Sequence, residues 1–183
     1  MEKLLIVGAG GFGRVVLEHA RKNFRCFFID DHQECPVDGT EIIGKISDLP
    51  TLAVSYKNLT VAIGNNQLRQ QVFQEAEKLG YVFPNIICSS VYVSPHAEVG
   101  HGCIILNNAV IQNGAHCGNG VIINPGVELH HDSFVDDYSL IYTNSVIRSL
   151  AVVGKRAWID SNITIGTGLK ISDDEVVRNS RMN

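Results

Sequence analysis

Aliphatic side chains recur at every sixth position across the second half of the chain, from Ile87 to Val177. Fifteen of these sixteen positions hold isoleucine, valine or leucine, and the exception is Cys117. The column comprises Ile87, Val93, Val99, Ile105, Ile111, Cys117, Ile123, Leu129, Val135, Ile141, Ile147, Val153, Ile159, Ile165, Ile171 and Val177. Ordinary amphipathic strands alternate with a period of two between irregular loops, so a fixed period of six indicates a stacked repeat.

Two further positions of each hexad support this interpretation. The residue two places before the aliphatic is mostly small, as in Ala109 and Ser133, and the residue just after it is often Gly, Asn or Asp, as in Gly118 and Asp136. We expect the aliphatic to point inward, the small residue to fit near a corner, and the following residue to bend the chain in a left-handed backbone conformation. Three hexads then close one coil, and the whole repeat gives about five stacked coils of a parallel β-helix.

The first half of the chain carries the pattern of a nucleotide-binding α/β unit. A short apolar strand over residues 3–7 leads into the glycine-rich segment Gly8–Gly13 and a helix over residues 14–21. Further strands are expected over residues 26–29, 59–63 and 81–85, with a helix over residues 67–79. A strand, a glycine-rich turn and a helix in this order let backbone N–H groups approach a phosphate at the helix N-terminus.

An acidic pair follows the second predicted strand. Asp30 and Asp31 lie about twenty residues after the glycines, where a carboxylate normally binds a ribose hydroxyl. A dinucleotide needs two mononucleotide-binding halves, and the segment before the repeat is long enough for one. We therefore expect a mononucleotide-linked ligand rather than NAD, although a glycine turn that serves packing alone stays open. The predicted fold is an α/β Rossmann-like half-domain at residues 1–85 and an all-β parallel β-helix at residues 86–183.

Composition narrows the classes of function. The formal net charge of −4 gives no reason to expect nucleic acid or an anionic membrane as a partner. No apolar run approaches the length of a membrane span. The five cysteines are scattered without a CxxC pair, which favours reduced thiols in a cytoplasmic protein over disulfides or a zinc site. We expect no metal.

Four segments together resemble the NeuD/PglD family of sugar acetyltransferases. They are GAGGFG at residues 8–13, IDD at 29–31, AIGNNQLR at 62–69, and HHD at 130–132 within the hexapeptide repeat. The resemblance covers nearly the whole chain. It implies a left-handed β-helix, a homotrimer, a nucleotide-activated sugar or sialic acid as substrate, and acetyl-CoA as cosubstrate between neighbouring β-helices. It also implies acetylation of an amino or hydroxyl group in glycan or surface-polysaccharide biosynthesis.

The resemblance assigns roles to individual residues. His131 falls on the family's catalytic histidine, and Asp132 on the acidic neighbour that orients it. The implied nucleotide-sugar contacts are Gly8, Gly10, Gly11, Phe12, Gly13, Asp30, Asp31, Asn65 and Asn66. The implied acetyl-CoA contacts are Asn124, Leu140, Ser149 and Ser161. Two of these depart from the family's pattern, because Leu140 stands where a second histidine is frequent and Ser149 stands where glycine is common.

Spacing alone leaves the role of His131 open. The residue lies two places after the inward-facing Leu129, so it should project outward, where a neutral imidazole beside a carboxylate can act as a general base. Spacing alone favours solvated turn residues for His130 and His131, and the family resemblance reverses that preference. Two classes of function therefore remain. The first is an acetyltransferase, and the second is a non-catalytic nucleotide-sugar-binding or structural trimer with a degenerate CoA site.

Overall fold

The computed structural model describes residues 1–178, which form two compact units that divide after Ile86. The β-helix is predicted to extend to residue 183, and residues 179–183 of that prediction lie outside the described part. No helix within residues 1–178 has the length and apolar character needed to cross a membrane.

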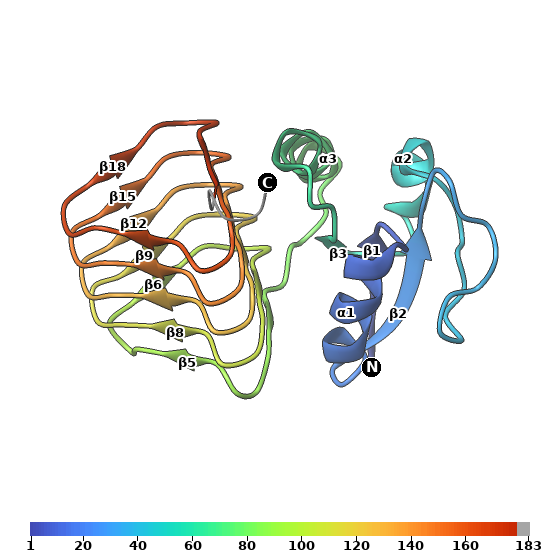
Figure 1. Ribbon diagram of the computed structural model, residues 1–183. Helices are drawn as coiled ribbons and strands as arrows, with labels where there is room; N and C mark the ends of the chain where they lie inside the picture. Colours follow the sequence, from blue (N-terminus) through green and yellow to red (C-terminus); the bar gives the residue numbers. More distant parts are fainter. Residues whose placement is uncertain (179–183) are drawn as a thin grey trace. The chain divides into compact units, whose positions relative to one another are not determined.

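The first unit is a three-stranded parallel sheet with helices, in the strand order β2–β1–β3. Its elements are β1 (Glu2–Val7), α1 (Gly11–Ala20), β2 (Phe24–Ile29), η1 (Ile46–Asp48), α2 (Leu49–Leu52), β3 (Asn58–Val61) and α3 (Asn66–Lys78). The central strand β1 is fully buried from Leu4 to Val7, as expected where helices cover a parallel sheet. Helix α1 packs on β1 and β2, and α3 packs on β3 (Figure 1). The predicted Rossmann-like half-domain is confirmed.

Three details of this unit differ from the sequence-based prediction. Helix α1 begins at Gly11, inside the glycine-rich segment, rather than at residue 14. The predicted strand at 81–85 is wrong: the segment makes one isolated bridge, between Asn58 and Val82, and Pro84 lacks the N–H group that a longer ladder needs. The short helices η1 and α2 have no periodic apolar pattern long enough to predict them.

The second unit is a three-sided parallel β-helix made of two-residue strands. They are β4 (Ile86–Ile87), β5 (Tyr92–Val93), β6 (Glu98–Val99), β7 (Ile104–Ile105), β8 (Val110–Ile111), β9 (His116–Cys117), β10 (Ile122–Ile123), β11 (Glu128–Leu129), β12 (Phe134–Val135), β13 (Leu140–Ile141), β14 (Val146–Ile147), β15 (Val152–Val153), β16 (Trp158–Ile159), β17 (Thr164–Ile165), β18 (Lys170–Ile171) and β19 (Val176–Val177). Every third strand pairs in parallel, so three sheets form, with the orders β19-β16-β13-β10-β7-β4, β17-β14-β11-β8-β5 and β18-β15-β12-β9-β6. Figure 1 shows one such face as β6, β9, β12, β15 and β18 lying one above another.

The register confirms the predicted coil of three hexads. Ile123 pairs with Ile105 on one side and with Ile141 on the other, so each residue lies beside the residue eighteen positions away. From Ile105 to Ile159 every residue of the six-residue column is fully buried, and the small residues two places earlier are buried with them. The β-helix core is therefore a stack of aliphatic layers.

The bends lie at a different position of the hexad from the one predicted. Left-handed backbone occurs three residues after the inward aliphatic, at Gly102, Asn108, Gly114, Gly120, Gly126, Asp132, Tyr138, Asn144, Leu150, Arg156, Asn162, Gly168 and Asp174. The glycines directly after the aliphatic serve a different purpose. A Cβ atom at Gly118 would lie 2.7 Å from the backbone nitrogen of Asp137, so glycine there allows the next coil to approach closely.

Candidate active site

His131 and Asp132 form the corner that follows strand β11 on the β-helix. Asp132 is one of the left-handed corner residues, with φ of 57°, a conformation that Asp tolerates better than most residues. Strand β11 pairs with β14 in the register Leu129–Ile147, so the equivalent corner of the next coil carries Ser149. The eighteen-residue coil therefore brings a predicted acetyl-CoA contact next to the predicted catalytic histidine.

These three side chains form a continuous hydrogen-bonded chain. His131 Nδ1 lies 2.8 Å from Asp132 Oδ2, and His131 Nε2 lies 2.8 Å from Ser149 Oγ. An ionised carboxylate only accepts hydrogen bonds, so the ring donates from Nδ1 to Asp132 and its Nε2 accepts from the Ser149 hydroxyl. The side chains of His131 and Asp132 are 59% and 57% exposed, which leaves the corner open to a ligand.

The preceding coil supports this corner from the other side. The backbone N–H of His131 donates to Gln112 Oε1 over 3.1 Å, and that of Asp132 donates to the Asn113 carbonyl over 3.2 Å. Gly114, eighteen residues before Asp132, leaves open the space that the Asp132 carboxylate occupies. Gln112 and Gly114 are supporting residues that sequence reasoning missed. Counting back one coil of eighteen residues from Asp132 would have identified Gly114.

The neighbouring His130 provides a useful contrast. Its Nε2 lies 3.3 Å from Glu128 Oε2, which is a longer contact between side chains that are 28% and 48% exposed. Among the contacts of residues 1–178, none from its Nδ1 parallels the one that His131 makes with Asp132. Of the two adjacent histidines, His131 therefore has the geometry of an oriented base.

The other predicted acetyl-CoA residues lie away from this corner. Asn124 and Ser161 follow β10 and β16, which belong to a different sheet from β11, and Leu140 lies within β13 of that sheet. The Asn124 amide donates to the Ile141 carbonyl over 3.2 Å, and the Ser161 N–H donates to Asp160 Oδ1 over 2.8 Å. Leu140 is 3% exposed. Of the four, the structure brings only Ser149 to His131.

In the first unit, a hollow lies beside the glycine-rich turn. It has a volume of about 400 Å³ and is lined by Ala9, Gly10, Gly11, Arg14, Gln33, Pro36, Val37 and Asp38. In open parallel sheets, ligands bind at the carboxyl ends of the strands, and this turn directly follows the carboxyl end of β1. Arg14 Nε donates to Asp38 Oδ2 over 2.9 Å. Arg14 thus places a guanidinium at the hollow, a residue that sequence reasoning did not single out.

The other glycines of the turn shape the backbone. Gly8 has φ of 99°, and a Cβ atom there would lie 2.9 Å from the Ala62 carbonyl oxygen. Gly13 lets helix α1 pack directly on the Gly8 carbonyl, where a Cβ atom would collide. The side chain of Phe12 is half-buried. These contacts show that part of the glycine pattern serves strand–helix packing.

Asp30 is bonded to the protein's own backbone. Its Oδ2 accepts from the Ala9 N–H over 2.7 Å, and its Oδ1 accepts from the N–H groups of His32 and Gln33 over 2.8 and 3.0 Å. Partial burial alone would raise the pKa of this carboxyl group, but the three N–H groups outweigh that effect and hold the pKa below its usual value. The carboxylate therefore fixes the glycine-rich turn.

The remaining candidates of this unit also make local hydrogen bonds. Asp31 Oδ1 accepts from the Ile46 N–H over 2.9 Å, and Asn65 caps α3 by accepting from the Leu68 N–H over 2.9 Å. Asn66 Oδ1 accepts from Arg69 Nη2 over 2.8 Å. Arg69 is 1% exposed and also donates to the Ile63 carbonyl over 2.8 Å. This buried arginine organises the turn after β3 and, after Arg14, is the second residue of this unit that sequence reasoning did not single out.

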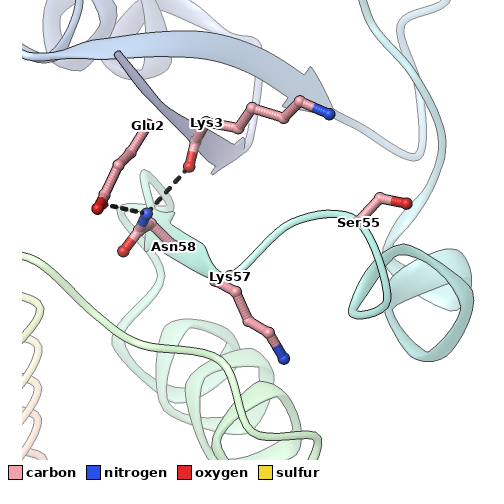
Figure 2. A pocket seen from close by; sticks show the side chains of 5 residues that line it. All are labelled: Glu2, Lys3, Ser55, Lys57 and Asn58. Carbon is pink, nitrogen blue, oxygen red and sulfur yellow. Dashed lines mark hydrogen bonds between the residues drawn. The ribbon is translucent and has the colours of Figure 1, made fainter.

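A second hollow, of about 350 Å³, lies at the opposite ends of the same strands. It is lined by Glu2, Lys3, Ser55, Lys57 and Asn58, which belong to or border the starts of β1 and β3. Figure 2 shows the Asn58 amide directed at the Glu2 carboxylate and the Lys3 carbonyl, whereas the two lysine amines point in different directions. Its position at the amino ends of the strands and its diverging cations argue against a nucleotide site.

The part of the chain that the structure describes contains no candidate metal site. There, no three His, Cys, Asp or Glu side chains gather in a way that would hold an ion. The chemistry available at the His131 corner is therefore that of an imidazole, a carboxylate and a hydroxyl.

Comparison with known proteins connects both units to one family. The family model of the PglD N-terminal domain matches residues 3–76. The acetyltransferase domain of PglB from Neisseria gonorrhoeae is 30% identical, with a TM-score of 0.72 over 96% of this chain and 93% of that chain. The same domain has been solved in complex with acetyl coenzyme A and is 29% identical.

The similarity extends to perosamine N-acetyltransferases. A mutant of the enzyme from Caulobacter crescentus, solved in complex with CoA and GDP-perosamine, is 27% identical, with a TM-score of 0.92 over 96% of this chain and 85% of that chain. GDP-perosamine N-acetyltransferase from Escherichia coli O157:H7 is 25% identical over 178 residues, which are 90% of this chain and 78% of that protein. The β-helix is left-handed, as in these relatives.

Proposed function

Because the chain belongs to the PglD/PglB family of acetyltransferases, we propose that it acetylates the amino group of a nucleotide-linked amino sugar, with His131 as the general base. The observation that carries the proposal is the 2.8 Å contact between His131 Nδ1 and Asp132 Oδ2 at an open corner of the β-helix. It leaves Nε2 as the proton acceptor.

The proposed transfer is direct. The lone pair of the neutral amine forms a bond with the carbonyl carbon of the acetyl thioester, and the bond from that carbon to sulfur breaks. The proton lost by the amine passes to His131 Nε2 and from there to the departing thiolate of CoA. Asp132 holds the Nδ1–H tautomer and stabilises the imidazolium that forms between the two proton transfers.

An amino acceptor is favoured over a hydroxyl because two of the relatives are named for N-acetylation of perosamine. The hollow beside the glycine-rich turn is the proposed nucleotide site. The turn's backbone N–H groups and the Arg14 guanidinium suit a diphosphate, since both donate to anionic oxygens. Asp30 contributes by holding the turn in place rather than through a free carboxylate.

The assembly and location that we propose follow from the family. We propose a homotrimer in which acetyl-CoA lies between neighbouring β-helices, close to Ser149. Trp158 and Val176, paired on one sheet and 38% and 46% exposed, offer apolar surface for a subunit contact. We propose a cytoplasmic location and a role in surface-polysaccharide synthesis; five free thiols suit a reducing compartment. Sedimentation equilibrium tests the trimer.

The activity is tested with acetyl-CoA and a panel of GDP-, UDP- and CMP-linked amino sugars, together with their hydroxyl analogues, by following release of the CoA thiol. The matched variants are His131→Ala and His130→Ala, which remove adjacent histidines that each contact a carboxylate. Loss of the base should lower kcat by about 10²- to 10⁴-fold. His130→Ala should keep the wild-type rate.

Calorimetric titration of the sugar nucleotide completes the test. Its affinity should be unchanged in His131→Ala, because the proposed nucleotide site lies in the first unit. Wild-type turnover by His131→Ala would overturn the assignment of the base. Binding of sugar nucleotides without any turnover or CoA binding would instead favour the non-catalytic nucleotide-sugar-binding protein.

A further inference from the structure

The hydroxyl of Ser149 contacts Nε2 of His131, the nitrogen that we propose as the base. Its Oγ lies 2.8 Å from Nε2, the atom that must take the proton of the acceptor amine. Ser149 comes from the next coil, and strand pairing between β11 and β14 fixes its distance from His131. The contact therefore joins two side chains that the coil register places at equivalent corners of successive coils.

The two contacts of the ring together determine its protonation pattern. Asp132 accepts from Nδ1–H, and the Ser149 hydroxyl can donate to the lone pair of Nε2. Turning the ring about its side-chain bonds would break both hydrogen bonds. A side chain that is 59% exposed is thus held in one orientation by groups from two coils.

We propose that Ser149 is a positioning residue, which presets His131 as a neutral base with its Nε2 lone pair directed at the Ser149 hydroxyl. The acceptor's amino group takes the place of the hydroxyl at Nε2, and Ser149 itself is never acetylated. This inference rests on the proposed function, because it assigns to Ser149 an effect that acts through the catalytic histidine.

The Ser149–His131–Asp132 chain also has the connectivity of a serine nucleophile with its base and orienting carboxylate. A nucleophilic serine would take the acetyl group from the thioester and carry it as an ester before the amine attacks. The two roles therefore predict opposite results when the protein is mixed with acetyl-CoA in the absence of an acceptor. A nucleophilic Ser149 would become acetylated, and a positioning Ser149 would not.

The first test uses nitrogen-15 NMR of histidine side chains in the full-length protein, with no ligand required. At a pH at which the His131 ring is neutral, the wild-type ring should show Nδ1 protonated and Nε2 as an acceptor. In Ser149→Ala the Nε2 signal should lose its hydrogen-bonded shift, whereas Nδ1 should stay protonated because Asp132 still accepts from it. Ser149→Thr, which keeps a hydroxyl, should restore the wild-type signals. Ser172→Ala, at an exposed corner of a later coil, is the control that leaves them unchanged.

The second test is kinetic. In Ser149→Ala, kcat should fall about tenfold with little change in the KM for acetyl-CoA, which is the scale expected for loss of one hydrogen bond. The acid limb of the kcat/KM profile should move to higher pH, since the hydroxyl no longer favours the neutral ring. Ser149→Thr should recover most of the rate. A structural role alone would leave the Nε2 signal and the pH profile unchanged.

The outcomes separate this inference from the proposed function. If His131→Ala is inactive while Ser149→Ala matches the wild type in rate and in the Nε2 signal, the positioning role is overturned and the base assignment stands. If His131→Ala is active, the proposed function fails whatever Ser149 does. An acetyl group found on Ser149 by mass spectrometry after mixing with acetyl-CoA alone would overturn the positioning role in favour of a nucleophile.

Discussion

Gly114 leaves room for the carboxylate of Asp132. The two residues occupy equivalent corners of successive coils, and a Cβ atom at Gly114 would collide with Asp132 Oδ1. Gly114→Ala should therefore displace the carboxylate from His131 and lower kcat roughly tenfold, the scale of an orienting hydrogen bond to a charged group. Steady-state kinetics at saturating substrates measure this effect.

A matched variant separates this effect from backbone strain. Gly126 has φ of 70° against 69° at Gly114, and a Cβ atom there would collide with Asn144 Oδ1 in the same manner. Gly126→Ala should lower thermal stability about as much as Gly114→Ala, because both place alanine in left-handed backbone. Only Gly114→Ala should lose activity, and equal loss in both variants would show that strain alone is responsible.

Asp30→Asn should loosen the glycine-rich turn. The amide group retains one acceptor oxygen in place of two, so the first unit should lose roughly 1 kcal/mol of stability at neutral pH. Hydrogen exchange of the Ala9 N–H should quicken in this variant. Asp31→Asn, which alters an exposed carboxylate bonded to a single N–H group, is the matched control and should change exchange at Ala9 far less.

The stabilising effect of Asp30 should depend on pH with a definite sign. Its pKa in the folded protein is lowered, so the stabilisation is fully present above the unfolded-state pKa of about 3.9 and is lost as the pH falls through the folded-state pKa. The stability difference between wild type and Asp30→Asn should therefore shrink below about pH 4. A difference that stays constant to pH 2 would exclude this carboxylate as its source.

Arg14→Ala should weaken binding of a sugar nucleotide by about tenfold, because a guanidinium beside the glycine-rich turn can donate to the diphosphate. Raising the salt concentration should weaken binding to the wild type more than to the variant. Arg25→Ala is the control, since Arg25 lies near the amino end of β2 and stacks over Phe27. Isothermal titration with the same ligand measures both affinities.

The aliphatic column should be most sensitive at its centre. Ile141 is fully buried, whereas Ile171 holds the same hexad position near the end of the stack and is only partly buried. Ile141→Ala should lower the free energy of unfolding by about 2–5 kcal/mol, and Ile171→Ala should lower it less. Urea unfolding can be followed through the fluorescence of Trp158, the chain's single tryptophan, which lies in the β-helix.

The period of six predicts the β-helix because one bend per hexad brings every sixth side chain to the inside, where stacked coils bury it. The position of the bend could not be predicted from composition in the same way. Tyr138, Leu150 and Arg156 adopt left-handed backbone although none of them favours it. Stacking against neighbouring coils imposes that conformation, which is a tertiary effect absent from local sequence.

The candidate site was predictable in part. His131 and Asp132 are adjacent in sequence, so their contact could be anticipated, whereas Ser149 meets them only through the eighteen-residue register. For Asp30, the spacing after the glycines suggested a ribose ligand, and the structure shows three backbone N–H groups bonded to its carboxylate. Spacing places a side chain near a turn but does not show which donors satisfy it.

The fixed coil length makes the β-helix modular. Insertion or deletion of one whole coil beyond Ser149 would lengthen or shorten the β-helix and keep every corner in line with the one beneath it. Loss of a single hexad would instead shift all later corners to the next side of the three-sided β-helix. Changes in chain length within this architecture should therefore be tolerated only in whole coils, and the His131 corner can lie at different heights in β-helices of different length.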